Sequence, residues 1–325
     1  MNKIITTVSI SLTLIFIIVT VCGCRSQNNL LAITIGPDGN LWFTEPNIRK
    51  ISKISPVTDG VKEYHIPGYD TPTLNGITAG PDGNLWFTEP RRDKICKISP
   101  ETGKVTEYPI PIANADPTAI TAGPDGNLWF TESQGIGKIS PMTGMINDYP
   151  IPTADANPGG ITSGPDGNLW FTEENANKIG KISPVTDVIT EYFITTAVDV
   201  ILDPIGIVAG PDGNIWFTEE NGTQIGKISP VTNVIKEYDV PNVNGGTSGI
   251  TAGPDGNIWF NESFNKIGEI SPSTGKITEY NVPLATALYG IIAGPDGNLW
   301  FTEENGKIGK ISPSLGDITE YSIHN

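Results

Sequence analysis

Short apolar runs separated by turn-forming residues follow one another along almost the whole chain after residue 30. In one example the runs are 76–80, 84–89, 94–99 and 105–110, rich in Ile, Val, Leu, Phe, Thr and Tyr. Pro-Asp-Gly separates the first two runs, and Ser-Pro-Glu-Thr-Gly separates the last two. Short runs of this composition are typical of β-strands, and Pro with Gly is typical of tight turns. The pattern predicts four antiparallel strands, which we number first to fourth.

The same four-strand pattern recurs at intervals of 41 to 46 residues. The string Gly-Pro-Asp-Gly-Asn begins at Gly36, Gly80, Gly123, Gly164, Gly210, Gly253 and Gly294. Each copy is followed by one of the seven tryptophans: Trp42, Trp86, Trp129, Trp170, Trp216, Trp259 and Trp300. Seven such units predict an all-β fold, a seven-bladed β-propeller of four-stranded antiparallel blades. We expect the tryptophans to pack between neighbouring blades.

Residues 1–24 differ from the repeats. Lys3 precedes an apolar run over 8–22 that is interrupted only by Ser and Thr, as in a signal peptide. Val-Cys-Gly-Cys at 21–24 resembles a bacterial lipobox, so we predict cleavage and lipidation at Cys24. An ordinary cleaved signal or an uncleaved anchor is the alternative. All three mean export, as a membrane-anchored lipoprotein or as a secreted or periplasmic protein, with a linker over 25–29 and one propeller domain over 30–325.

The chain enters at the first strand of blade 1 and ends with the fourth strand of blade 7, at 317–323. No spare strand-like run stands just before Leu30 to complete the last blade. We therefore expect the ring to close by packing of the first and seventh blades, without a shared sheet.

Composition excludes several classes of function. The chain has 36 Asp and Glu against 20 Lys and Arg, and a formal net charge of −16. Nucleic acids and anionic membrane surfaces are bound through clustered Lys and Arg, so we expect membrane contact only through the lipid anchor. Two histidines, His65 and His324, and three cysteines cannot build a zinc finger, an iron–sulfur site or a disulfide framework. Cys96 is expected to be inert, and the protein to be a monomer.

Strand direction assigns the connections to two faces of the ring. Turns between first and second strands, and between third and fourth strands, are nearly the same in every copy and share one face. The loops between second and third strands, and from each fourth strand to the next unit, share the other face and differ between copies. Variable loops on a fixed scaffold are where ligands bind. We name this the variable face and predict that it binds a small molecule or a peptide-like ligand.

Two positions per unit are predicted at the centre of the variable face. One opens the first strand: Leu31, Asn75, Thr118, Gly159, Ile205, Ser248 and Tyr289. The other is the glutamate that ends the second strand: Glu45, Glu89, Glu132, Glu173, Glu219, Glu262 and Glu303. Symmetry about the Pro-Asp-Gly turn makes the two positions approximate cross-strand neighbours. The predicted ligand-binding residues are Asn75, Thr118, Glu132, Glu219 and Glu262.

The glutamates also have a structural interpretation. A lysine follows four or five residues later in five copies: Lys50, Lys94, Lys178, Lys266 and Lys307. Each would form a half-exposed ion pair with its glutamate, which leaves Glu132 and Glu219 as the free carboxylates. A divalent cation held by two or three of the glutamates is the alternative. The Asp of each Pro-Asp-Gly lies on the other face and is predicted to be a turn residue.

The repeat resembles that of the virginiamycin B lyases. The shared pattern is P-x-G-I-T-A-G-P-D-G-N-L-W-F-T-E, then K-I-G-K-I-S and I-T-E-Y-x-I-P, over residues 30–323. The resemblance implies a seven-bladed propeller that opens streptogramin B antibiotics with Mg²⁺. It also implies elimination, in which a base takes the α-proton beside a carbonyl and the ester C–O bond breaks.

The site residues that the resemblance implies are only partly present. The family has histidines that open the first strands of blades 6 and 7, where this chain has Ser248 and Tyr289, and a glutamate where it has Ala287. Glu303 matches the family glutamate that ends the second strand of blade 7. If the chain is a lyase, Tyr289, Glu303 and Ser248 are its candidate catalytic residues. Ser248 cannot act alone as a base, and Tyr289 would need a strongly lowered pKa.

Three hypotheses follow from these residues. The missing histidines favour a ligand-binding protein that has lost the lyase chemistry. The retained Glu303 and the glutamate ring favour an enzyme, either an Mg²⁺-dependent C–O lyase of streptogramin-type depsipeptides or a lactonase-like metal hydrolase. A structural surface lipoprotein with a protein partner is the third hypothesis. Since the repeat is scaffold, the resemblance implies the fold more firmly than the activity.

Overall fold

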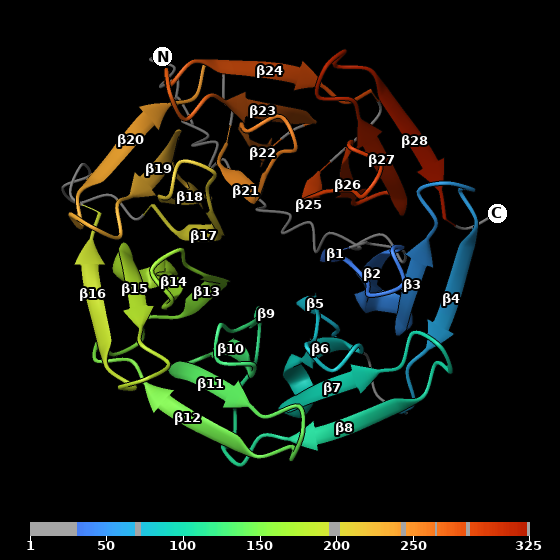
Figure 1. Cartoon of the computed structure of the whole chain (residues 1–325), viewed down its shortest axis with the longest axis vertical. Coiled ribbons are helices and arrows are strands. Elements are labelled where there is room, and N and C mark those ends of the chain that lie inside the picture. Colours follow the sequence, from blue (N-terminus) through green and yellow to red (C-terminus); the bar gives the residue numbers. More distant parts are fainter. Residues whose placement is uncertain are drawn as a thin grey trace, which may run out of the picture.

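Seven four-stranded antiparallel sheets stand around a common axis, which confirms the predicted seven-bladed β-propeller (Figure 1). The computed structural model describes residues 31–68, 73–194, 202–241, 245–263, 265–283 and 287–323. In every blade the strands follow their order in the sequence, from the first at the axis to the fourth at the rim. Cys24, the rest of the predicted leader and His324 lie outside the described residues. In the described part of the chain, no helix has the length and apolar character needed to span a membrane.

The strands nearest the axis, and those that follow them, keep the predicted positions to within about a residue. The first strands are β1 (Ile33–Ile35), β5 (Ile77–Ala79), β9 (Ile120–Ala122), β13 (Pro158–Ser163), β17 (Pro204–Ala209), β21 (Thr247–Ala252) and β25 (Leu288–Ala293). The second strands are β2 (Leu41–Glu45), β6 (Leu85–Glu89), β10 (Leu128–Glu132), β14 (Leu169–Glu173), β18 (Ile215–Glu219), β22 (Ile258–Glu262) and β26 (Leu299–Glu303).

The outer half of each blade is equally regular. The third strands are β3 (Lys50–Ile54), β7 (Lys94–Ile98), β11 (Gly135–Ile139), β15 (Lys178–Ile182), β19 (Gln224–Ile228), β23 (Lys266–Ile270) and β27 (Lys307–Ile311). The fourth strands are β4 (Val61–His65), β8 (Val105–Pro109), β12 (Ile146–Pro150), β16 (Ile189–Phe193), β20 (Ile235–Asp239), β24 (Ile277–Asn281) and β28 (Ile318–Ser322). Short 3₁₀ turns join second to third strands in three blades: η1 (Pro46–Ile48), η2 (Pro90–Arg92) and η3 (Glu174–Ala176).

Both faces of each second strand are buried between blades. Successive side chains of a strand alternate in direction, so the Leu, Phe and Glu of Leu-Trp-Phe-Thr-Glu share one face, and Trp and Thr share the other. Trp42 accordingly packs in one core with Leu85 and Phe87 of the next blade. It also stacks on Tyr64 of its own fourth strand, with ring centroids 5.1 Å apart. The predicted packing of tryptophan between blades is confirmed.

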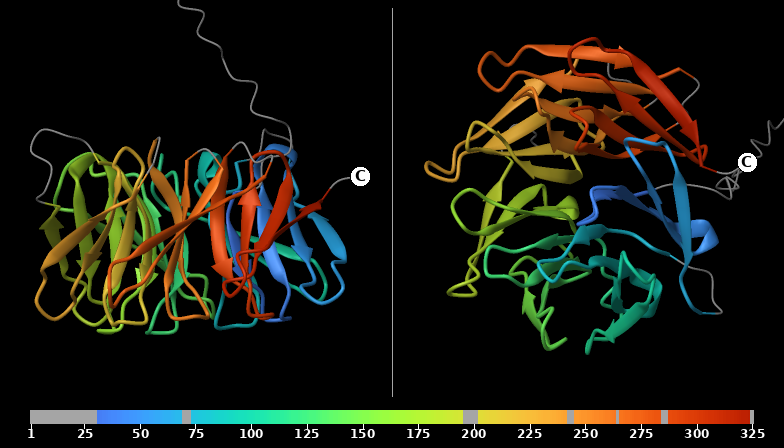
Figure 2. Two further views of the ribbon diagram at one scale, coloured as in Figure 1. Left: turned by 90° about the horizontal axis from the view of Figure 1, so that it is seen from above. Right: turned by 45° about the vertical axis from the view of Figure 1, so that its right-hand side comes forward.

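The Pro-Asp-Gly-Asn turns anchor the tryptophans. Asp82 Oδ1 accepts hydrogen bonds from the Trp86 indole N–H at 2.9 Å and from the Asn84 backbone N–H at 3.2 Å. Gly83 has a φ of 75°, which suits glycine at this turn position. Asp82 is therefore a turn residue, as predicted. The side view shows these regular turns along one rim and the variable loops along the other (Figure 2).

In six of the seven blades, a threonine of the second strand ties the blade to the next one. Thr88 Oγ1 accepts the Gly76 N–H of its own first strand at 3.0 Å and donates to the carbonyl of Thr118 in the next blade at 2.7 Å. The same bond closes the ring, because Thr302 Oγ1 donates to the Leu31 carbonyl at 2.9 Å. Trp300 packs against blade 1 in the closing core. Blades 1 and 7 have separate sheets within the described residues, so the expected mode of closure is confirmed.

Candidate functional site

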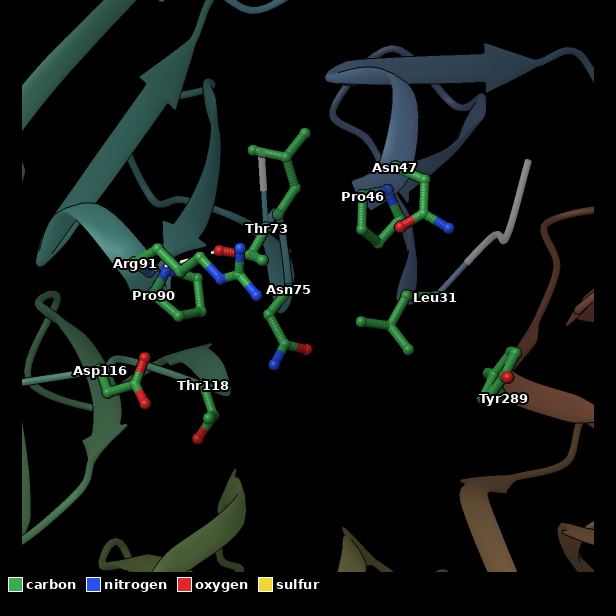
Figure 3. Close-up of a pocket in the computed structure, with 11 residues that line it drawn as sticks. Leu31, Pro46, Asn47, Thr73, Asn75, Pro90, Arg91, Asp116, Thr118 and Tyr289 are labelled. Carbon is green, nitrogen blue, oxygen red and sulfur yellow. Dashed lines mark hydrogen bonds between the residues drawn. The ribbon is translucent and has the colours of Figure 1, made fainter. Parts of the chain in front are cut away.

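Four of the residues predicted at the centre of the variable face line one cavity of about 470 Å³. They are Leu31, Asn75, Thr118 and Tyr289, which open the first strands of blades 1, 2, 3 and 7. Figure 3 shows these side chains around the same space. We call it the mouth cavity. Ser248 opens the first strand of blade 6 but is not among its lining residues.

Loops of the variable face supply the rest of the lining. The apolar part comes from Pro46, Leu74 and Pro90. The polar part comes from Asn47, Thr73, Arg91 and Asp116. The sequence placed these residues in variable loops but gave no signal that they would meet, because the loops belong to different blades.

The first-strand openings are held rigidly by the bonds between blades. The carbonyl of Asn75 accepts a hydrogen bond from Thr44 Oγ1 at 3.0 Å. The carbonyl of Tyr289 accepts one from Asn261 Nδ2, also at 3.0 Å, because blade 6 has asparagine in place of threonine. Ser248 Oγ donates to the Leu288 carbonyl of the next blade at 3.2 Å. The backbone beneath the mouth cavity is therefore fixed before any ligand arrives, which lowers the entropic cost of binding.

The seven glutamates that end the second strands are buried, with exposed fractions of 0 to 4 %. Each shares the face of Leu and Phe and so lies between blades. The pairing with the first strand also differs from the one predicted by counting from the turn. Glu262 pairs with Thr247 and Glu303 pairs with Leu288, because the first strand has a bulge after Thr247 and after Leu288. The predicted ring of carboxylates at the mouth is wrong, and Glu219, Glu262 and Glu303 do not line the mouth cavity.

Most of these glutamates lie beside a second carboxyl group on the fourth strand. Glu219 lies within hydrogen-bond reach of Glu237, which pairs with Gly226 of the third strand. Burial, and then Glu237, raise the pKa of Glu219 to about 9. The pKa values of Glu132, Glu173 and Glu262 are raised to about 8, chiefly by burial. Burial and Glu320 raise that of Glu303 to about 7.

The lysines pair with the fourth-strand glutamates, which corrects the predicted ion pairs. Lys50 Nζ lies 2.8 Å from Glu63, and Lys266 Nζ lies 3.0 Å from Glu279. The other pairs are Lys94–Glu107, Lys178–Glu191 and Lys307–Glu320. The side chain of the lysine that begins the third strand thus extends past the second-strand glutamate to the carboxylate on the fourth strand.

In blades 1 and 2 the buried glutamate of the second strand has a hydrogen-bond or ion-pair partner other than a fourth-strand carboxyl group. Glu89 binds Arg49 of blade 1 at 2.6 Å and Arg92 at 3.4 Å. The Ser52 hydroxyl donates to Glu45. These contacts explain how a carboxyl group can stay buried at this position of the repeat.

The model of the virginiamycin B lyase family matches residues 23–200 and 199–325. The chain belongs to this family. A streptogramin B lyase structure is 36 % identical over 91 % of this chain and 94 % of its own, with a TM-score of 0.81. Virginiamycin B lyase from Staphylococcus aureus is 35 % identical over 88 % of this chain and 95 % of its own, with a TM-score of 0.80. A catalytically inactive histidine-to-alanine variant of that enzyme, with quinupristin, matches at 35 % identity over 88 % of this chain and 96 % of its own, with a TM-score of 0.80.

A search of curated proteins finds no match. Within this virginiamycin B lyase family member, the mouth cavity contains no histidine among its lining residues. His65 lies on the outermost strand β4 of blade 1, exposed and away from the axis. Cys96 is fully buried, and burial, with Glu89 and Glu107, raises the pKa of its thiol well above the usual value. The thiol stays protonated, which agrees with the expectation that it is inert.

The magnesium ion that the family implies does not fit the described residues. Among them, no group of three or more His, Cys, Asp or Glu side chains could hold a metal ion. Among the described residues that line the mouth cavity, one is a carboxylate, Asp116. Magnesium sites use carboxylates and phosphates in octahedral geometry. The described residues of the mouth cavity therefore do not form a magnesium site.

Proposed function

We propose that this propeller binds a small-molecule or peptide-like ligand in the mouth cavity and has lost the lyase chemistry of its family. The observation that carries the proposal is a mouth cavity lined from four blades, with no imidazole among the described residues that line it. The two positions where the family resemblance places histidines hold Ser248 and Tyr289. A propeller that keeps the pocket but lacks the histidine bases can still bind a ligand without catalysing elimination.

The lining of the mouth cavity supports a ligand with amide groups and apolar side chains. About 470 Å³ lies within the range of small-molecule sites. Leu31, Leu74 and Tyr289 offer apolar surface. Asn75 can donate to and accept from a peptide group, and Arg91 can donate to a carbonyl.

The three candidate catalytic residues do not all line the mouth cavity. A general base must lie within hydrogen-bond reach of the proton that it takes. Of the three candidates only Tyr289 lines the mouth cavity. Glu303 is fully buried and accepts a hydrogen bond from Asn305 Nδ2 at 3.0 Å, on the side of the blade that faces Glu320.

Retained lyase activity is the second candidate function. It is favoured by 36 % identity to a streptogramin B lyase over 91 % of this chain. Tyr289 would then be the group nearest the substrate, and Ser248 and Glu303 would act from behind the cavity wall. We treat this as the alternative because Tyr289 alone of the three lines the mouth cavity.

One experiment separates the two functions. The purified protein is mixed with a streptogramin B antibiotic, with and without Mg²⁺, and followed by calorimetry and by chromatography with mass detection. We expect binding without turnover. A linear product of unchanged mass would establish elimination and overturn the proposal, and a product heavier by one water would indicate hydrolysis. Absence of binding to this antibiotic and to a panel of cyclic depsipeptides would also overturn it.

A matched pair of variants locates the binding site. Arg91→Ala removes a cavity cation, and we expect affinity to fall roughly tenfold, as for loss of a hydrogen bond to a charged group. Lys236→Ala removes the same charge from an exposed position on β20 and should leave affinity unchanged. Equal losses in both variants would show that net charge, not the mouth cavity, controls binding.

We also infer that the protein is exported and carries a lipid at Cys24, from the leader sequence described above. In a bacterial host the protein should incorporate labelled palmitate and fractionate with membranes. Cys24→Ser should abolish labelling. Labelling that survives this change would reject the lipobox, and a cytosolic product would reject export.

A further inference from the structure

A second cavity, of about 480 Å³, lies at blade 3, away from the mouth cavity and with no lining residue in common. Its apolar walls include Ile112, Ala115 and Pro150. Its polar lining includes the carboxyl groups of Glu132 and Asp148. We call it the blade-3 cavity. It lies where the loop that leaves blade 2 meets strands β10, β11 and β12.

Three departures from the repeat enlarge this one cavity. Gly135 begins the third strand, where the other blades have a long side chain: Lys50, Lys94, Lys178, Gln224, Lys266 and Lys307. Two residues alone join β10 to β11, whereas blades 1, 2 and 4 have a 3₁₀ turn there. Asp148 is one carbon shorter than the glutamate of the other blades. All three changes remove atoms from the same place.

The other blades show what this place accommodates. In blade 6 the ammonium of Lys266 lies 3.0 Å from Glu279, and in blade 1 that of Lys50 lies 2.8 Å from Glu63. Register places Gly135 at the lysine position and Asp148 at the glutamate position. Blade 3 therefore keeps the carboxyl groups and lacks the tethered ammonium.

The carboxyl pair of blade 3 lacks a cation. Glu132 is 4 % exposed, and the buried carboxyl groups of Glu132 and Asp148 bond to each other, while Glu132 Oε1 and Asp148 Oδ1 receive no hydrogen bond from any other group described. Among the described residues, no ion pair includes Glu132 or Asp148. Burial, and then Asp148, raise the pKa of Glu132 to about 8, and Asp93 adds negative charge nearby. The pair therefore holds a proton in place of a cation, and an ammonium group that entered would replace this proton and pair with the two carboxylates.

The apolar wall is held in place before a ligand binds. The Asp93 carboxylate accepts the backbone N–H groups of Asn114 and Asp116, each at 3.0 Å. The backbone N–H of Ser133 donates to the Ala115 carbonyl at 2.8 Å. A wall fixed at both ends loses little entropy on binding.

We propose that the blade-3 cavity binds a small ligand that carries a primary ammonium group on an apolar body. The ammonium takes the position of the missing lysine and bonds to Glu132 and Asp148. The apolar body packs on Ile112, Ala115 and Pro150. A volume of about 480 Å³ leaves room for an aromatic ring beyond the ammonium.

Three probes of one shape and different charge test the proposal on the purified full-length protein. They are 2-phenylethylammonium, 2-phenylethanol and 3-phenylpropanoate, titrated by saturation-transfer NMR. We expect the ammonium to bind roughly tenfold or more tightly than the alcohol, since a hydrogen bond to a charged group is the stronger one. The carboxylate should not bind. Equal affinity of ammonium and alcohol, or no binding of the ammonium, would overturn the proposal.

Variants then assign the binding to this cavity. Glu132→Gln and Asp148→Asn should each lower ammonium affinity roughly tenfold. The matched control Glu219→Gln changes the equivalent residue of blade 5 and should leave affinity unchanged. An equal loss in this control would overturn the assignment.

A tethered ammonium gives a second, independent test. Gly135→Lys should abolish binding, because its own ammonium fills the site. Gly135→Ala adds the same Cβ, which would lie 2.9 Å from the Tyr149 carbonyl, without the ammonium. We expect Gly135→Ala to keep binding. If both variants fold and bind the probe equally, the ammonium does not occupy the lysine position and the proposal fails.

Discussion

At the scale of single residues, the buried carboxyl pairs make stability depend on pH. The pKa of Glu219 is raised from 4.5 to about 9, by burial first and by Glu237 second. The folded protein keeps a proton there that the unfolded chain releases above pH 4.5, so the free energy of unfolding falls as pH rises from about 5 to about 9. Glu132, Glu173 and Glu262, with pKa values of about 8, act in the same direction.

Glu219→Gln tests this pH dependence. The amide cannot ionise, so we expect little change in the free energy of unfolding at pH 5. At pH 8 we expect a gain of at least about 1.4 kcal/mol, the value of one pKa unit. Urea unfolding at both pH values measures the difference. An effect of the same size at both would contradict the assignment.

Glu89→Gln is the matched control at the same position of the repeat. Glu89 binds Arg49 at 2.6 Å, and the Arg49 side chain is 10 % exposed. Removal of the carboxylate leaves a nearly buried guanidinium without this partner, so we expect a loss of about 3 kcal/mol at pH 8. The two substitutions should therefore have opposite signs.

At the scale of strands, turn residues and apolar runs predicted where the strands lie. The pairing between the first and second strands was predicted one residue out of register. The predicted runs 84–89 and 94–99 became β6 and β7 to within a residue. Counting from the Pro-Asp-Gly turn paired Ser248 with Glu262, whereas Thr247 is the partner because a bulge follows it. The burial of the glutamates could have been inferred, since they share the face of Leu and Phe. The bond between blades could not, because threonine looks like any other strand residue.

Thr302→Val tests the bond that closes the ring. Valine keeps the shape of threonine but cannot donate to the Leu31 carbonyl or accept the Gly290 N–H, bonds of 2.9 and 2.8 Å. We expect the free energy of unfolding to fall by about 1–3 kcal/mol. Thr302→Ser keeps the hydroxyl and should lose less. A serine variant as unstable as the valine variant would show that the methyl group, and not the hydrogen bond, matters.

At the scale of the whole molecule, the repeat predicts the ring but not its binding site. The mouth cavity joins Leu31 of blade 1 to Tyr289 of blade 7, two residues at opposite ends of the propeller sequence. Arg91 and Asp116 enter it from different loops. This set of lining residues depends on how the ring closes and on the conformations of the loops. The repeated sequence pattern predicts neither of them. The variable face was predicted because strand direction alone decides it.

A closed propeller should have seven interfaces of similar strength, including the one between the chain's first and last blades. Trp300 packs on Leu41 and Phe43 across the closure, as Trp129 packs on Leu169 and Phe171 between blades 3 and 4.

The indole N–H groups of Trp129 and Trp300 each donate a hydrogen bond of 3.0 Å to the aspartate of their own turn. We therefore expect Trp300→Phe and Trp129→Phe to lower the free energy of unfolding equally, by roughly 1–3 kcal/mol each, less than full truncation to alanine. Urea unfolding of both variants measures this. A clearly smaller loss for Trp300→Phe would mean that the closing interface is the weak one and opens before the others.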